Sequence, residues 1–289
     1  MKHLYSRLAE EFPLLFGKNS VYAVHAERFK EDFEGTFADV VLKYARGGGF
    51  GPSTPPTLIL LEQQGTLARY FSRFILDSAG SDCYSKLLLA LKKSGMIQQS
   101  IFGSLNYECL LEQSADGLDL TVDYWCDQNH PDVVSLAKIH GSCNFVTQRF
   151  DRHQQAMLSA QAGFFGVEVT PLCVHDLEQA LSAQLAAGSF PVMSQISASK
   201  ENFVDSTKFR AARNTWQEGV SNARDKVIVI GVSCNPNDSH ILEPIKEVRV
   251  PLLYIGGDFA KWKETNSGFK YLGETFEDGL EHLLNSMDI

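Results

Sequence analysis

The segment KVIVIGVSCNPNDSHILEPIKE, residues 226–247, constrains the fold more than any other part of the chain. Four consecutive branched residues, Val227–Ile230, predict a buried strand. Gly231 then permits a sharp turn, and a helical pattern begins near Ser239. A strand, a polar loop and a helix in this order are typical of α/β proteins with parallel strands.

The same order of elements recurs elsewhere in the 289 residues. Apolar runs end at Phe102, Ile139 and Ile255, and each is followed by a polar or glycine-containing loop. We therefore predict an α/β fold with a Rossmann-like parallel sheet flanked by helices. Because ligands bind at the carboxyl ends of parallel strands, we expect these loops and the loop after Ile230 to lie on one edge.

The length fits a single domain that covers residues 1–289. Helical spacing dominates between residues 28 and 95, which predicts a helical subdomain or insertion there. The glycine- and proline-rich stretch GGGFGPSTPP, residues 47–56, interrupts this region.

Composition limits the possible partners. The formal charge of −9 disfavours nucleic acid, although backbone amides at a helix start can still bind a small anionic nucleotide. No apolar run reaches the roughly 18–20 residues that span a bilayer. The N-terminal sequence predicts a short amphipathic helix and no signal peptide. These features predict a cytoplasmic protein and no membrane partner, and they leave homo-oligomerisation open.

The six cysteines are irregularly spaced and include no CxxC pair. In a chain without a signal peptide, they are interpreted as reduced thiols. Tetrahedral thiolate zinc needs paired cysteines, so we predict no metal site. The segment CDQNH, residues 126–130, is interpreted as a solvated loop.

Three loop segments carry candidate site residues, and each also has a plain structural interpretation. A histidine beside a glycine, as in His140–Gly141, is more often a loop residue than a catalyst. Asn106 stands where an asparagine commonly caps a helix. Gly231 permits close backbone approach, while Ser233 and Asp238 offer hydrogen-bonding groups, but many α/β folds carry such a loop without a ligand.

Together, SLNYECLLE, KIHGSCNF and VIVIGVSCNPND resemble the sirtuin-like family of NAD-consuming domains. The resemblance spans residues 100–258 and is closest to the bacterial branch, whose members carry TNYD..LE, KLHGS and viGyS..D segments. The matching residues are Asn106, Tyr107 and Glu112, then Lys138, His140, Gly141 and Ser142, and finally Gly231, Ser233 and Asp238.

The resemblance implies an enzyme that hydrolyses NAD to ADP-ribose and nicotinamide, with NAD as substrate. His140 would be the general base, and Asn106 would hold the nicotinamide ribose or a water molecule. The reaction passes through an oxocarbenium-like state, and a histidine titrates near neutral pH, as such a base should. The other matching loop residues, Gly141, Ser142, Gly231, Ser233 and Asp238, would bind the cofactor. In the bacterial branch this reaction serves antiphage defence.

The chain departs from the family at the phosphate-binding glycine loop, GAGxS, of which no intact copy exists. Our first candidate is FPLLFGKNS, interpreted as a strand that runs into a turn, with Gly17 and Ser20 at the phosphates. Gly47–Gly51 is the second candidate, or else a linker before a helix. The absence of paired cysteines argues against a protein deacylase. A catalytically inactive nucleotide-binding or protein-interaction module is therefore the alternative function.

Overall fold

The computed structural model describes residues 3–20, 22–31, 36–37, 39–40, 56–77, 80–150, 164–165, 167–193, 204–235, 238–265 and 268–287. The chain forms two compact units whose segments alternate along the sequence. The first unit comprises Met1–Phe74, Asn106–Cys109 and His140–Thr207, and the second comprises Ile75–Leu105, Leu110–Ile139 and Lys208–Ile289.

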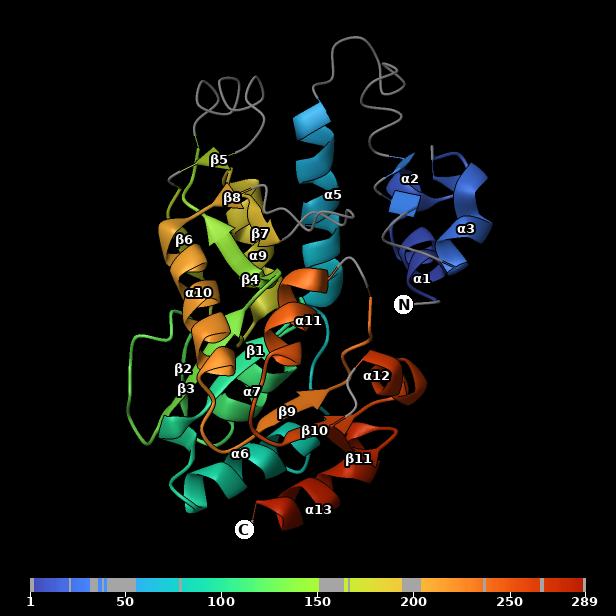
Figure 1. Ribbon diagram of the computed structural model, residues 1–289. Helices are drawn as coiled ribbons and strands as arrows, with labels where there is room; N and C mark the ends of the chain where they lie inside the picture. The colour runs from blue at the N-terminus through green and yellow to red at the C-terminus, as the bar shows by residue number, and fades with distance from the viewer. Residues whose placement is uncertain are drawn as a thin grey trace. The chain divides into compact units, whose positions relative to one another are not determined.

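The second unit holds two parallel three-stranded sheets (Figure 1). One sheet has the order β1-β3-β2, and the other has the order β11-β10-β9. The strands are β1 (Ile101–Ser104), β2 (Thr121–Asp123), β3 (Val133–Lys138), β9 (Val227–Ile230), β10 (Leu252–Ile255) and β11 (Phe269–Gly273). The helices are α6 (Cys83–Lys93), η2 (Ile97–Gln99), α7 (Leu110–Asp116), α10 (Thr207–Ser221), α11 (Ser239–Lys246), α12 (Phe259–Thr265) and α13 (Phe276–Ser286).

Local sequence explains several of these boundaries. The Asp82 carboxylate caps α6 by accepting a hydrogen bond of 2.9 Å from the Ser85 amide. After α6, Gly95 adopts a φ of +70°, the left-handed conformation that commonly ends helices. The apolar faces of α6 and α13 pack with residues of β3 and β10 in one buried cluster, which includes Leu88, Leu136 and Leu283.

The first unit combines helices with an antiparallel sheet of order β6-β4-β7. Its strands are β4 (Gly141–Thr147), β6 (Val169–Pro171) and β7 (Pro191–Met193), and β5 (Phe164–Phe165) pairs with β8 (Val204–Asp205). Its helices are α1 (Leu4–Glu11), α2 (Pro13–Phe16), η1 (Ala23–His25), α3 (Ala26–Glu31), α5 (Pro56–Phe71) and α9 (Leu177–Ala186).

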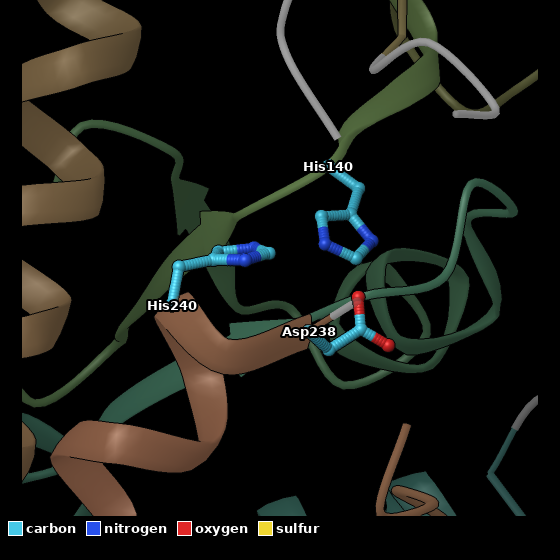
Figure 2. A group of neighbouring side chains, drawn as sticks. All are labelled: His140, Asp238 and His240. Atoms are coloured by element: carbon cyan, nitrogen blue, oxygen red, sulfur yellow. The ribbon is translucent and has the colours of Figure 1, made fainter. Parts of the chain in front are cut away.

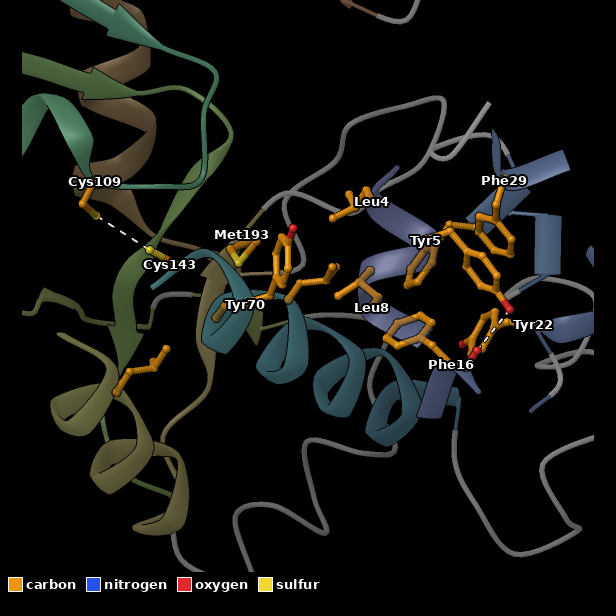
Figure 3. Close-up of a cluster of buried hydrophobic side chains, with 14 of the residues drawn as sticks. Leu4, Tyr5, Leu8, Phe16, Tyr22, Phe29, Tyr70, Cys109, Cys143 and Met193 are labelled. Carbon is orange, nitrogen blue, oxygen red and sulfur yellow. Dashed lines mark hydrogen bonds between the residues drawn. The ribbon is translucent and has the colours of Figure 1, made fainter. Parts of the chain in front are cut away.

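An aromatic-rich core holds the first unit together (Figure 3). Tyr5 stacks on Phe29 with ring centroids 4.6 Å apart, and its hydroxyl donates to the Phe16 carbonyl at 3.1 Å. The same buried cluster extends to Tyr70 of α5 and Met193 of β7. Aromatic pairs of this kind add to the stabilisation that burial provides.

The structure confirms a mixed α/β chain with small parallel sheets. The strand predicted at Val227–Ile230 has those bounds, and α11 begins at Ser239 as predicted. The prediction of a strand before Gly17 is wrong, because α2 occupies Pro13–Phe16. The antiparallel sheet around β4 was not predicted. None of the helices among the described residues combines the length and apolar character needed to cross a membrane.

Candidate functional site

Two candidate residues leave neighbouring parallel strands at matched positions. Ser104, the last residue of β1, lies opposite Lys138, the last residue of β3. The Ile139 amide extends this pairing by donating to the Ser104 carbonyl at 2.9 Å. Asn106 and His140 each follow two residues later. The chain therefore delivers both from the same ends of adjacent strands, as the sequence predicts.

Hydrogen bonds join the two segments beyond these strands. The Cys143 amide donates to the Tyr107 carbonyl at 2.8 Å, and the Ser142 hydroxyl donates to the same carbonyl at 3.3 Å. The Cys109 sulfur lies 3.5 Å from the Ser142 oxygen and 3.7 Å from the Cys143 sulfur. The position of His140 is thus tied to that of the Asn106 segment. The Ser142 hydroxyl has a structural partner, and its role in cofactor binding stays a prediction.

His140 lies in the turn between β3 and β4, with 3% of its surface exposed (Figure 2). Gly141 follows with a φ of +78°, and a Cβ atom there would lie only 2.2 Å from the Val192 carbonyl oxygen. Only glycine fits this backbone conformation and this close approach to β7. The glycine therefore shapes the turn that carries the histidine.

Asn106 is exposed, and its amide nitrogen donates to the Glu108 carboxylate at 2.8 Å. The helix that follows begins only at Leu110, so Asn106 is not at its N-cap position. An exposed hydrogen bond of this kind can be exchanged for one to a ligand without a large loss of stability. The cleft that we expect Asn106 to share with His140 stays a prediction.

The third motif forms a loop after β9 in the second unit, and hydrogen bonds hold its backbone in place. Gly231 has a φ of +68°, and its amide donates to the Ile255 carbonyl at 2.8 Å. The Val232 carbonyl accepts from the Trp262 indole at 2.8 Å and from the Tyr254 hydroxyl at 3.2 Å. These bonds fix the backbone next to Gly231, where a Cβ atom would meet no atom within 4 Å.

Ser233 and Asp238 occupy different environments beyond this loop. Ser233 is exposed, whereas Asp238 is buried directly before α11. Asp238 and His240 both stand at the start of α11 (Figure 2), with potential ligand atoms within 4.8 Å of one another. These residues belong to the second unit and His140 to the first.

Loops after three strands converge on one apolar cluster of the second unit. Tyr254 and Trp262 form its aromatic part, with ring centroids 4.9 Å apart. Residues that follow β1, β3 and β9 pack in or against this cluster, and they are Leu105, Ile139, Val232 and Cys234. The carboxyl ends of strands from both parallel sheets are therefore joined by common packing.

The predicted phosphate loop, Gly17–Ser20, follows a helix and not a strand. Gly17 ends helix α2 with extended dihedrals, φ −72° and ψ −177°. A Cβ atom there would lie 2.2 Å from the Pro13 carbonyl oxygen, so packing alone requires the glycine. The Ser20 amide donates to the Gly17 carbonyl at 2.9 Å. Phosphate binding by Gly17 and Ser20 stays a prediction, and Gly47–Gly51 lies outside the described residues.

We expect elemental analysis to find no stoichiometric zinc in the purified protein. Burial, together with the neighbouring Asp123 and Asp127 carboxylates, raises the pKa of the Cys126 thiol to about 12. Zinc binds the thiolate, so this thiol is a poor ligand. Within the described part of the chain, no cysteine belongs to a cluster of three potential metal ligands. One zinc per chain would contradict this prediction and reopen the deacylase interpretation.

Two features near the site were not predicted from the sequence. Lys138 and Glu112 match the family motifs, but their pairing as a buried ion pair, at 3.1 Å, depends on the fold. Gln63 and Gln64 lie on the buried side of α5. The sequence around them, Glu62 to Thr66, is polar and offers no signal that these two side chains are buried.

Comparison of the chain with protein-family models and with curated proteins gives no match.

Proposed function

We propose that this chain is a sirtuin-like NAD-binding domain that hydrolyses NAD to ADP-ribose and nicotinamide, with a role in bacterial antiphage defence. The matched positions of Asn106 and His140 beyond paired strands carry the proposal. In a parallel α/β sheet, this is where ligands bind. The proposal also assigns the two parallel sheets to a Rossmann-like core.

The proposed reaction needs a base and an oriented water molecule. Water forms a bond to the anomeric carbon of the nicotinamide ribose, the glycosidic bond breaks, and nicotinamide leaves with the bonding electrons. His140 takes the proton that the water loses. The Asn106 side chain orients the water or the ribose hydroxyls, which reduces the entropy lost in reaching the transition state.

The backbone around His140 supports a positioning role. Gly141 fixes the turn, and the Cys143–Tyr107 hydrogen bond joins this turn to the Asn106 segment. A catalytic pair must be held to within a fraction of an ångström, and these constraints come from backbone atoms. The family resemblance assigns the rest of the dinucleotide to Gly231, Ser233 and Asp238 of the second unit.

One observation favours the alternative function, a catalytically inactive nucleotide-binding or protein-interaction module. Family members cradle the pyrophosphate on a glycine loop that follows a strand, and here Gly17 follows helix α2. Its tight contact with Pro13 gives the glycine a packing role. A module without this cradle would bind NAD weakly and would not cleave it.

Incubation of the purified protein with NAD is expected to release nicotinamide and ADP-ribose in equal amounts. Chromatography would separate both products from NAD. A sample without protein and a sample of heat-denatured protein serve as controls. Binding of NAD without release of nicotinamide would favour the inactive module over the enzyme.

A further inference from the structure

The side chain of Gln63 on α5 is fully buried, yet it makes no hydrogen bond to any residue that the structure describes. Its exposed fraction is 0%, and within the described part of the chain neither its amide nitrogen nor its amide oxygen has a partner. Buried amide groups are almost always hydrogen-bonded, because removing them from water without a partner is unfavourable. A group that is absent from the free chain would satisfy both atoms at once.

The adjacent residue places this amide near the candidate site. The Gln64 amide nitrogen donates to the Met193 carbonyl at 2.9 Å. Met193 of β7 lies opposite Gly141 of β4, the residue that follows His140. Helix α5 also packs along β4 and β7 in the first unit (Figure 1). Gln63 therefore lies on the helix turn that packs next to the start of β4.

A second buried polar group lies in the core cluster to which α5 contributes. Tyr22 is fully buried, and its hydroxyl has no hydrogen-bond partner among the residues that the structure describes. Burial raises the pKa of Tyr22, and the Glu62 carboxylate raises it further. The phenol is therefore neutral. Two neutral groups that both donate and accept hydrogen bonds would suit an uncharged, planar polar ligand group.

We propose that the Gln63 amide recognises a ligand group that presents a hydrogen-bond donor beside an acceptor in one plane. This inference rests on the proposed function, since NAD carries two such groups. One is the carboxamide of nicotinamide, and the other is the N6/N7 edge of adenine, which glutamine side chains bind in a bidentate manner elsewhere. ADP-ribose carries only the adenine and free nicotinamide only the carboxamide, so the two compounds distinguish the sources.

The first test compares Gln63→Met with Gln64→Met in the absence of ligand. Methionine has a similar length and flexibility, so it fills the space without polar atoms. Gln63→Met is expected to keep or raise the melting temperature, by up to about 2 °C, because it removes an amide without partners. Gln64→Met is the matched control: the oxygen of this amide also has no described partner, but its nitrogen bonds to Met193. Loss of that bond is expected to lower the melting temperature by about 2 °C or more relative to Gln63→Met. An equal loss in both variants would overturn the proposal.

The second test adds ADP-ribose or nicotinamide to the wild-type protein and to Gln63→Met. At a ligand concentration of about one hundred times Kd, the wild-type melting temperature is expected to rise by about 5 °C. We expect Gln63→Met to bind one of the two compounds at least about tenfold more weakly. An unchanged affinity for both, which would mean that the amide meets only a buried water, would overturn the proposal. No rise with either compound in the wild type would also overturn it.

These measurements separate this inference from the proposed reaction. Thermal shifts with ADP-ribose and nicotinamide require binding but no bond cleavage. If the protein releases no nicotinamide from NAD while Gln63→Met shows the expected pattern, the hydrolase proposal fails and the recognition role of Gln63 stands. If nicotinamide is released and Gln63→Met keeps full affinity for both compounds, the reverse holds.

Discussion

Replacing His140 with alanine is expected to lower the rate of NAD cleavage by about 10²–10⁴-fold, the usual contribution of a general base. The reason is chemical, since alanine cannot accept the proton that the attacking water loses. The measurement is the rate of nicotinamide release at saturating NAD. A fall in kcat with little change in KM would locate the loss in the transition state.

The stability of this variant must be measured in parallel, because His140 is 3% exposed. Alanine would leave a small cavity there, so His140→Gln, which retains more of the side-chain volume, is the second variant. Both should lose activity to a similar degree. His130→Ala is the matched control, because His130 is exposed, and it should retain full activity. Normal NAD cleavage by His140→Ala, together with a large fall in melting temperature, would show that His140 is a structural loop residue.

Asn106→Ala tests the proposed orienting role of this side chain. Asn106 is exposed, and its side chain donates to the carboxylate of the nearby Glu108. Its loss should therefore reduce turnover by a factor similar to that for His140→Ala without a large change in stability. A variant with normal turnover would remove Asn106 from the catalytic machinery and leave His140 alone in that role.

The second unit was largely predictable because local and tertiary preferences agree there. Val227–Ile230 consists of β-branched residues, which suit a strand in any tertiary context. Gly231 then permits the turn with a φ of +68°, and the helical pattern that follows begins at Ser239. The matched positions of Asn106 and His140 also followed from strand ends alone, since only a parallel pairing of β1 and β3 was needed.

The first unit was harder to predict because its elements depend on tertiary packing. Pro13–Phe16 contains an apolar run too short for periodicity to separate a strand from a helix. Proline at the first position favours a helix start, and Tyr5 accommodates the helix by donating to the Phe16 carbonyl. Strand β4 carries glycine, serine and asparagine, which suggest a loop, yet every one of its residues is buried.

In the candidate site, too, some features follow from local sequence and others depend on the fold. Residue types and their order pointed to His140 and Asn106. The unpartnered amide of Gln63 could not be predicted, because hydrogen-bond satisfaction depends on which groups the fold brings within reach. The pairing of Lys138 with Glu112 could not be predicted either, although both residues lie in segments that match the family motifs.

The ion pair between Lys138 and Glu112 is a strong constraint within the second unit. The lysine nitrogen and a carboxylate oxygen are 3.1 Å apart, and the side chains are only 1% and 2% exposed. The pair joins α7 to the end of β3, two residues before His140. A buried charge without its partner is strongly destabilising, whereas a well-packed apolar pair of similar volume is often neutral or better.

Lys138→Met is therefore expected to lower the free energy of unfolding by about 3–5 kcal/mol, since it leaves the Glu112 carboxylate buried without its cation. The double variant Lys138→Met, Glu112→Leu should recover most of that loss, because neither charge remains. Lys92→Met is the matched control: its ion pair with Asp132, at 2.9 Å, has side chains 34% and 51% exposed, and such pairs contribute little. Urea denaturation of the four proteins measures the differences. A Lys138→Met protein as stable as Lys92→Met, or a double variant less stable than Lys138→Met, would show that the pair does not hold α7 to β3.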